Sequence, residues 1–406
     1  MDINLFLEVI LSAGYGFLVL AIIQKIFFGK IYRAPFFAFI IYTILAICYY
    51  WLNITIVPEY RGFTGGLHVG TDDCSFFAQI VDVRFSLPMT CDDLLEYHNY
   101  SRFIDTIYPF TVRTPLPIIV FNCIGISCIP ILGKIIYYKY FPEAKRDHII
   151  YIIFFLSPMI LMNGLILIRD GWSTQFFMFF IFNVISNRKL SVILLSAFIV
   201  ALFRPTFVIF PILFYIIERN FEKPNFYFRM GAASIIVLPL AFFILKINKG
   251  IDLTEGLVRQ DYVSGFLGQF GEESTLYRIM MLPFPLNIIL SFFFFLTSPF
   301  LKWGFTFEGT FVMRKLFTFF EALLMTILIP GFLINFFYFW KNNSSFKRLA
   351  FFTVLSILLL STISMQARHK MIILPVIYML FLYSSKRNQK LILPIIILYA
   401  IFQLVI

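Results

Sequence analysis

Long apolar runs without a charged residue recur along the whole chain, and they limit its fold more than any other feature. A helix needs about 20 predominantly apolar residues to cross the hydrocarbon core of a bilayer. Six runs have 19 to 25 residues: 34–58, 114–133, 149–168, 279–301, 322–340 and 349–367. Seven more have 13 to 17 residues: 9–24, 171–187, 190–203, 205–217, 230–245, 371–385 and 391–406. The pattern predicts an all-α integral membrane protein.

The composition excludes the main alternatives. Of the 406 residues, 60% are hydrophobic and 14% are charged, whereas an average soluble domain has about 25% charged residues. A soluble fold could not bury this much apolar surface. The net charge is +11, but Lys and Arg stand singly between apolar runs, unlike the clustered cations of a nucleic-acid-binding surface. The runs also do not alternate as the strands of a membrane β-barrel do.

The basic residues predict the orientation of the chain, because cytoplasmic loops of membrane proteins are enriched in Lys and Arg. If the loops alternate between the two sides, one set holds 18 basic and four acidic residues. Its basic residues are Lys25, Lys30, Arg33, Lys134, Lys139, Lys145, Arg146, Arg188, Lys189, Arg219, Lys223, Arg229, Lys341, Lys347, Arg348, Lys386, Arg387 and Lys390. This set is predicted to be cytoplasmic, with the N-terminus outside. Asp2 and Glu8 replace the basic start of a signal peptide, so we expect no cleaved leader.

One apolar run would break this charge asymmetry if it crossed the membrane. A crossing by residues 284–300 would place the basic loops at 341–348 and 386–390 outside. Three prolines also interrupt the segment, and proline breaks a continuous helix: Pro283, Pro285 and Pro299. We therefore expect a re-entrant or interfacial hairpin here, and about 12 transmembrane helices in all.

Two long connections are predicted to face outward from a single polytopic membrane domain, residues 1–406. Residues 58–113 form the first external loop and carry eight acidic residues. Residues 247–315 form the second, which includes the hairpin. No separate soluble domain is evident, so any chemistry is expected at the outer membrane boundary. Four tryptophans lie near segment ends, as interfacial aromatic residues do: Trp51, Trp172, Trp303 and Trp340.

Cysteine usage fits an oxidising compartment on the outer side. Cys74 and Cys91 share the first external loop, where an oxidising compartment would allow a disulfide. A bridge would close a loop of about 18 residues, worth roughly 3 kcal/mol, and the alternative is two unrelated free thiols. Cys48, Cys123 and Cys128 lie within apolar runs and are expected to be small buried hydrophobic residues.

A glycine-rich acidic motif in the first external loop is a candidate catalytic site. Residues 65–73 read Gly-Gly-Leu-His-Val-Gly-Thr-Asp-Asp, with His68, Asp72 and Asp73. Glycines permit a tight turn. Paired carboxylates at a membrane surface can deprotonate a sugar hydroxyl, or hold Mg²⁺ or Mn²⁺ against a diphosphate. The alternative is helix capping by Thr71 or Asp72, although a cap needs only one such residue.

Two charged positions at the ends of apolar runs are candidate phosphate-binding sites. Arg169 and Asp170 lie at the predicted outer end of a span, and the alternative is a local ion pair in a tight helical hairpin. Arg204 and Pro205 split residues 190–217 into halves too short to cross a bilayer upright, so Arg204 is expected at or below the outer interface. An ionisable group at that depth is a functional candidate, and snorkelling to the headgroups is the alternative.

A compact basic cluster, Arg368-His369-Lys370, is predicted on the external side, against the positive-inside bias. Pairing with anionic phosphate explains it most simply, and contact with acidic lipid headgroups is the alternative. The sequence contains no zinc-spaced set of His and Cys, no P-loop, no dinucleotide fingerprint and no nucleophile elbow. The candidate chemistry is therefore a cationic phosphate clamp beside a general base.

These motifs occur in an order that resembles a known family. From the N-terminus they are the acidic glycine-rich loop, Arg169-Asp170 opening a helical hairpin, the Arg204-Pro205 break, a Phe-rich hairpin with Ser298-Pro299-Phe300, and Arg368-His369-Lys370 followed by Pro375. The chain is similar to bacterial polytopic membrane glycosyltransferases of the GT-C type. It looks closest to O-antigen and other repeat-unit polysaccharide polymerases.

The resemblance implies a multi-pass glycosyltransferase of the bacterial inner membrane, with its active face in the periplasm. It would polymerise undecaprenyl-diphosphate-linked oligosaccharide repeat units, in lipopolysaccharide biosynthesis (O-antigen) or capsule biosynthesis. Asp72 or Asp73 would act as base or as metal or phosphate partner, and Arg169, Arg204 and Arg368 would bind the lipid phosphate. No cofactor is required, although Mg²⁺ or Mn²⁺ can take part. The partners would be the lipid-linked substrate, the membrane and a chain-length regulator protein, and no nucleic acid.

Two other functions stay open at this point. One is a glycosyltransferase that adds a single sugar from a polyprenyl-monophosphate donor. The other is a flippase or transporter for lipid-linked oligosaccharides. Transporters usually show internal repeats and helices broken near the membrane midplane, and the sequence shows no internal repeat.

Overall fold

The structure is a computed structural model, and it describes residues 3–58, 76–77, 99–110, 114–144, 148–226, 278–279, 282–283, 286–307, 310–363, 367–387 and 389–405. The chain divides into two compact units. Unit 1 comprises Met1–Phe203 and Lys302–Glu321, and unit 2 comprises Arg204–Leu301 and Ala322–Ile406. The external loops predicted at 58–113 and 247–315 lie in large part outside the described residues. Their placement, and the single polytopic domain, stay predictions.

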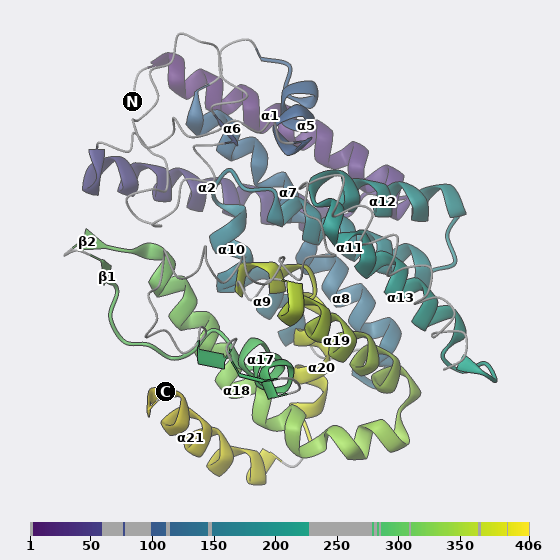
Figure 1. The fold of residues 1–406 in the computed structure, drawn as a ribbon. Helices are drawn as coiled ribbons and strands as arrows, with labels where there is room; N and C mark the ends of the chain where they lie inside the picture. The colour runs from purple at the N-terminus through teal and green to yellow at the C-terminus, as the bar shows by residue number, and fades with distance from the viewer. Residues whose placement is uncertain are drawn as a thin grey trace. The chain divides into compact units, whose positions relative to one another are not determined.

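Unit 1 is built from helices and one short hairpin (Figure 1). Its helices are α1 (Ile3–Phe28), α2 (Arg33–Ile56), α5 (Asn99–Ile107), α6 (Pro115–Asn122), α7 (Ile124–Ser127), α8 (Ile129–Tyr140), η3 (Pro142–Ala144), α9 (Ile149–Leu156), α10 (Pro158–Gly164), α11 (Asp170–Ile185) and α12 (Leu190–Phe203). Strands β1 (Thr306–Phe307) and β2 (Thr310–Phe311) pair antiparallel, Thr306 with Phe311 and Phe307 with Thr310. The long helix α18 (Met313–Asn342) begins here and continues into unit 2.

The core of unit 1 is the segment formed by α6, α7 and α8. Every residue of α6 and α7 is buried, as are more than half of those of α8. It packs against α1, α2, α9 and α11. Two glycines allow close approach: a Cβ at Gly125 would overlap the Trp172 indole, and one at Gly133 would overlap the Phe154 ring. Trp172 therefore sits directly against the backbone of α7.

The apolar run at 149–168, which the sequence presents as one span, is not one continuous helix. It forms α9 and α10, with Ser157 between them. Pro158 follows, and a proline has no N–H to continue the hydrogen bonds of α9. The Ser157 hydroxyl accepts a hydrogen bond from Ile160 N at 3.4 Å and so caps the new helix. Unit 1 thus contains a helix broken within an apolar segment.

Unit 2 is helical in the part that the structure describes. Its elements are η4 (Pro205–Val208), α13 (Ile209–Asn220), α17 (Leu286–Thr297), the rest of α18, α19 (Ser344–Ile363), η6 (Ala367–Ile372), α20 (Leu374–Ser385) and α21 (Gln389–Val405). Helix α17 packs along α19, and α19 also contacts α13 and α20. The 12 residues of α17 span about 18 Å, less than the roughly 30 Å of a bilayer core. This length suits the hairpin predicted at 284–300, whose re-entrant placement stays a prediction.

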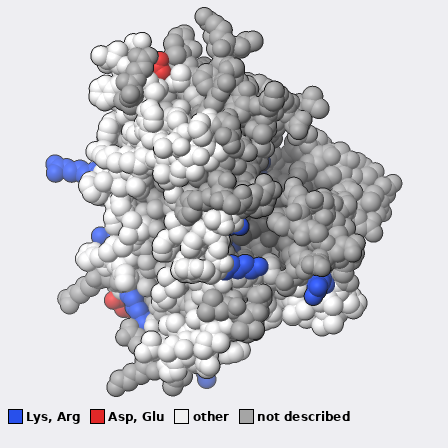
Figure 2. Space-filling model, turned by 90° about the vertical axis from the view of Figure 1, so that its left-hand side faces the viewer, with Lys and Arg blue, Asp and Glu red and all other residues white. Residues whose placement is uncertain are grey.

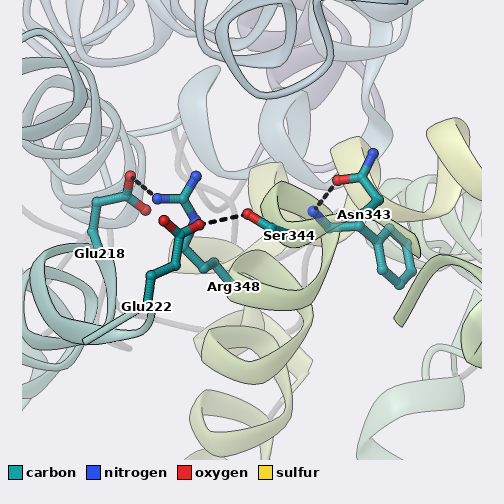
Figure 3. A network of polar contacts seen from close by, with 6 residues as sticks. Glu218, Glu222, Asn343, Ser344 and Arg348 are labelled. Atoms are coloured by element: carbon teal, nitrogen blue, oxygen red, sulfur yellow. Dashed lines mark hydrogen bonds and ion pairs between the residues drawn. The ribbon is translucent and has the colours of Figure 1, made fainter. Parts of the chain in front are cut away.

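One end of unit 2 gathers three loops that the charge pattern assigns to the same side of the membrane. The bonds that join them are Arg348 Nη1 to Glu218 Oε1 (3.2 Å), Ser344 Oγ to Glu222 Oε1 (2.6 Å) and Asn343 Nδ2 to Tyr383 OH (3.0 Å). Figure 3 shows the first two, at the contact between the end of α13 and the start of α19. The third ties the α18–α19 turn to the end of α20. The three loops therefore lie together, and their cytoplasmic placement stays a prediction.

Among the described residues, five helical segments are long and apolar enough to cross a membrane. They are Ile3–Phe28, Arg33–Ile56, Pro115–Tyr140, Met313–Asn342 and Ser344–Ser361, and shorter apolar helices cover Leu190–Phe203, Leu286–Thr297, Leu374–Ser385 and Ile392–Ile401. Large apolar side chains remain exposed along most of them. Figure 2 shows few, scattered charged side chains among the described residues of one face. The protein is thus an α-helical membrane protein, and a count of about 12 spans stays a prediction.

The cysteines of the apolar runs differ in their surroundings. Cys123 and Cys128 are buried, as predicted. Cys48 is exposed, so the prediction that it is buried is wrong. The reason is that Cys48 shares one face of α2 with the exposed side chains of Ile44 and Leu52, one turn away on either side. That face is suited to lipid contact.

Candidate functional site

Arg204 lies where the sequence predicts a break between two helices. Helix α12 ends at Phe203, and η4 begins at Pro205. The backbone of Arg204 is extended, with φ −141° and ψ 93°, because the ring of a proline disfavours the helical region for the residue before it. The Arg204 side chain is only 8% exposed. The break therefore places a cation in the interior of unit 2.

Arg204 and His369 are 165 positions apart in the sequence and form a hydrogen bond. Arg204 Nη1 lies 3.0 Å from His369 Nε2. A guanidinium can only donate, so Nε2 accepts, the ring proton is on Nδ1, and the imidazole is neutral. The guanidinium also lies over the Phe207 ring, 5.1 Å from its centroid. His369 meets the same ring edge-on, with 5.9 Å between centroids. These contacts hold the guanidinium between an aromatic face and an imidazole.

The neighbouring Lys370 makes a different set of contacts. Its ammonium donates to the carbonyl oxygens of Phe295, Leu296 and Ser298, at 3.2, 2.9 and 2.8 Å. These carbonyls lie at the C-terminal end of α17, where backbone acceptors have no partner within the helix. Lys370 is 2% exposed, and η6 carries both it and His369. One short element thus presents two neighbouring polar side chains to different partners.

The helix lengths are compatible with a position of this cationic cluster within an apolar layer. Glu218, near the end of α13, bonds to Arg348 at the loop end of unit 2. From Glu218 back to Arg204, the chain follows most of α13 and all of η4, which is roughly 20 to 25 Å. The path from His369 through the end of η6 and along α20 to the loop end of unit 2 has a similar length. Since a bilayer core is about 30 Å thick, these lengths would allow the cluster to lie near the far boundary of the apolar layer, and the depth predicted for Arg204 stays a prediction.

In unit 1, a neutral hydrogen-bond network surrounds Asn122. Asn122 Oδ1 accepts from Tyr100 OH at 2.6 Å and from Trp172 Nε1 at 2.7 Å, and Nδ2 donates to Ile166 O at 2.6 Å. Tyr100 and Trp172 are fully buried, and Asn122 is 1% exposed. The network joins α5, α6 and α11 to the segment that precedes Arg169. Trp172 is therefore a core residue, and its predicted placement among interfacial aromatics is wrong.

Arg169 and Asp170 follow this segment directly. Asp170 is the first residue of α11 and is 2% exposed, at the helix end where the backbone dipole favours a negative charge. The Arg169 guanidinium lies 5.4 Å from the centroid of the Phe76 ring. Burial and the Asp170 carboxylate raise the pKa of Tyr100, and Arg169 lowers it to a smaller extent. Tyr100 is therefore a neutral phenol at physiological pH, within electrostatic reach of the Arg169–Asp170 pair.

Asn122 and Glu321 are among the buried polar residues that the sequence does not single out. Glu321 of α18 is fully buried and accepts a hydrogen bond from Met159 N at 3.3 Å. A signal for Glu321 exists, because it is a lone acid directly before the apolar run 322–340, where a charge is costly. No such signal exists for Asn122, whose partners come from other helices.

The predicted site residues fall into separate parts of the molecule. Arg204, His369 and Lys370 belong to unit 2, and Arg169 and Asp170 belong to unit 1. His68, Asp72, Asp73, Cys74 and Cys91 lie outside the described residues, as does the side chain of Arg368. Their roles, the disulfide and the metal stay predictions. The chain matches no protein-family model, and neither a curated protein nor a solved structure matches it significantly.

Proposed function

We propose that the protein is a glycosyltransferase of the bacterial inner membrane that polymerises undecaprenyl-diphosphate-linked oligosaccharide repeat units at the periplasmic face. The observation that carries the proposal is the buried Arg204–His369 pair in a unit built from apolar helices. A lipid-linked sugar keeps its polyprenyl chain in the bilayer, while its phosphates need charged donors. A guanidinium held at the edge of an apolar layer meets both requirements.

In this proposal, Arg204 stabilises the phosphate that leaves the anomeric carbon. The acceptor hydroxyl oxygen bonds to that carbon while the bond to the diphosphate breaks, so negative charge grows on the leaving group. A cation fixed in advance is most effective at this stage, because it needs no rearrangement as the charge develops. The aromatic and imidazole contacts of Arg204 fit such a fixed position. The role of Asp72 or Asp73 as general base belongs to the same proposal.

A flippase for lipid-linked oligosaccharides is a second candidate, and one observation favours it. The helix at 149–164 is broken at Ser157, and the buried carboxylate of Glu321 bonds to Met159 N at the break. Broken helices with charged groups at the break occur in transporters, where they bind substrate or ions. The cationic cluster of unit 2 suits a phosphate in either function, so an experiment must separate them.

Deletion of the gene, followed by gel analysis of the cell-surface lipopolysaccharide, separates the candidates. A polymerase defect leaves lipid A core capped with a single repeat unit. Core without any repeat would indicate a flippase, a ligase or an earlier transferase. Full-length ladders in the deletion strain would contradict both candidates. Complementation with Asp73→Asn or Arg204→Ala should fail to restore ladders while the protein is still expressed, and unchanged ladders with both would remove these residues from the site.

A further inference from the structure

Lys370 differs from the other cations predicted to bind phosphate, because its bonds are with the backbone of α17. An ammonium has three N–H donors, and the structure shows three carbonyl oxygens within 3.2 Å of Nζ, those of Phe295, Leu296 and Ser298. These three acceptors are enough to engage every donor of the ammonium. With all three donors engaged, the ammonium has none left for a phosphate oxygen.

We propose that Lys370 is a positioning residue: its ammonium occupies a carbonyl cage at the end of α17 and joins this helix to η6, so that phosphate contacts fall to Arg204 and His369. The cage itself is independent of the function proposed above. The assignment of phosphate contacts to the other two residues rests on that function.

The chemistry of the cage favours lysine over arginine. Carbonyls at the C-terminal end of a helix carry the negative end of the backbone dipole, and they attract a cation there. An ammonium is a compact point charge with three donors that can turn toward three separate carbonyls. A guanidinium is planar and presents its donors as a fork, which suits the oxygens of one phosphate or carboxylate. A phosphate-binding residue would therefore tolerate Lys370→Arg, whereas the cage would not.

The cage also explains how the chain holds His369. Lys370 is 2% exposed and follows His369 in η6. Anchoring its ammonium to three backbone atoms of α17 fixes the position of η6, and with it the imidazole that bonds to Arg204. Lys370 thus acts on the phosphate site through its neighbour.

Chemical rescue tests the cage in the purified full-length protein. We expect Lys370→Ala to lower the thermal midpoint by about 5 °C or more, and methylammonium chloride to restore it in a saturable manner. Tetramethylammonium chloride has the same charge but no N–H donor, so it should not restore the midpoint. Lys370→Met should be destabilised and not rescued, because its side chain fills the space that methylammonium would enter. Lys370→Arg should also be destabilised, and the exposed Lys341→Ala should match the wild type.

A wild-type midpoint for Lys370→Arg, or equal effects of the two ammonium salts on Lys370→Ala, would overturn the proposal. If the alanine variant does not fold, acetylation of the wild-type protein gives a second measurement. Lys370 should react at least about 100-fold more slowly than Lys341 under native conditions, and equal rates would also overturn the proposal. None of these measurements uses transferase activity. A result that overturns the carbonyl cage would therefore leave the proposed function untouched, and the reverse also holds.

Discussion

In unit 1, Asn122 accepts hydrogen bonds from Tyr100 and Trp172 and donates one to a backbone carbonyl, so that neutral groups satisfy one another. In unit 2, the buried polar side chains include two cations, Arg204 and Lys370, beside neutral groups such as Asn335. Arg204 bonds to an imidazole and lies over an aromatic ring, and Lys370 bonds to three carbonyls. The two units are built from the same kinds of apolar helix, and these two sites differ in charge: a neutral network at Asn122 and buried cations at Arg204 and Lys370.

This difference separates groups that stabilise the fold from groups that are retained for chemistry. A satisfied neutral network contributes to stability, since each hydrogen bond is worth about 1 kcal/mol. A buried cation costs free energy even when its partners are good. This cost is compatible with the proposal that Arg204 is retained to bind an anionic ligand. The comparison gives Asn122 a structural role, while ligand binding at Arg204 stays a proposal.

The largest effect is expected from Arg204→Ala, which should reduce polymer formation on the order of 100-fold or more, because it removes a cation that stabilises developing charge. Surface polysaccharide ladders from complemented deletion cells measure this loss. Arg219→Ala is the matched control, since Arg219 is an exposed cation in the last turn of α13 and should leave the ladders intact. Loss of ladders in the control, at equal expression, would remove the special role of Arg204.

Asn122→Leu should have the next largest effect, on stability. It leaves the buried Tyr100 hydroxyl, the Trp172 indole N–H and the Ile166 carbonyl without their shared partner, which should lower the free energy of unfolding by about 3 kcal/mol or more. Thermal unfolding in detergent measures the change. Asn163→Leu is the control, because its buried amide makes one local bond, to Met159 O, and should cost about 1 kcal/mol. Equal losses would contradict the view of Asn122 as the centre of a network.

Alanine substitution at two glycines compares a closely packed position in unit 2 with an open position in unit 1. A Cβ at Gly331 would lie 2.5 Å from the backbone Cα of Ser385. Because a backbone atom cannot move aside as a side chain can, Gly331→Ala should lower the free energy of unfolding by about 1 to 3 kcal/mol. Gly14 in α1 has no atom within 4 Å of such a Cβ. Gly14→Ala should therefore be neutral or stabilise by about 0.5 to 1 kcal/mol, since alanine favours a helix. A loss of thermal midpoint in Gly14→Ala would contradict this placement of α1.

The smallest effect concerns the pH dependence of unit 1. Burial and Asp170 raise the pKa of Tyr100 in the folded protein, so the phenol contributes stability that is fully present below the unfolded pKa of about 10. This contribution is lost as the pH rises toward the folded pKa. At about pH 8, Tyr100→Phe should cost only about 1 kcal/mol, because Trp172 still bonds to Asn122. Between about pH 8 and 10.5, the wild type should lose more of its thermal midpoint than Tyr100→Phe, and equal losses would count against a buried Tyr100.

Much of the fold can be predicted because its causes are local. The apolar runs predict helices, and the break at Arg204 follows from the proline after it. The contact of Arg348 with Glu218 at the end of α13 is compatible with the charge pattern, whose assignment of loops to one side stays a prediction. The break at Ser157 has an equally local cause in Pro158, although the uniform hydrophobicity of the run concealed it.

The partners of the candidate site cannot be predicted in the same way. The sequence presents Arg204, His369 and Lys370 as three cations, and only the fold shows which atoms face them. His369 is an acceptor for Arg204, and the carbonyls that hold Lys370 have no signature in the sequence. The identity of a charged residue thus predicts its chemistry, whereas its role depends on neighbours brought from distant helices.

Binding of undecaprenyl diphosphate by the purified protein tests the central claim most directly. The thermal midpoint in detergent would be measured with this lipid and with undecaprenol, which has the same chain and no phosphate. We predict that the diphosphate raises the midpoint of the wild type and of Arg219→Ala well beyond the effect of undecaprenol, and that Arg204→Ala loses this difference. Equal stabilisation by the two lipids, or an undiminished response of Arg204→Ala, would contradict a phosphate site at Arg204.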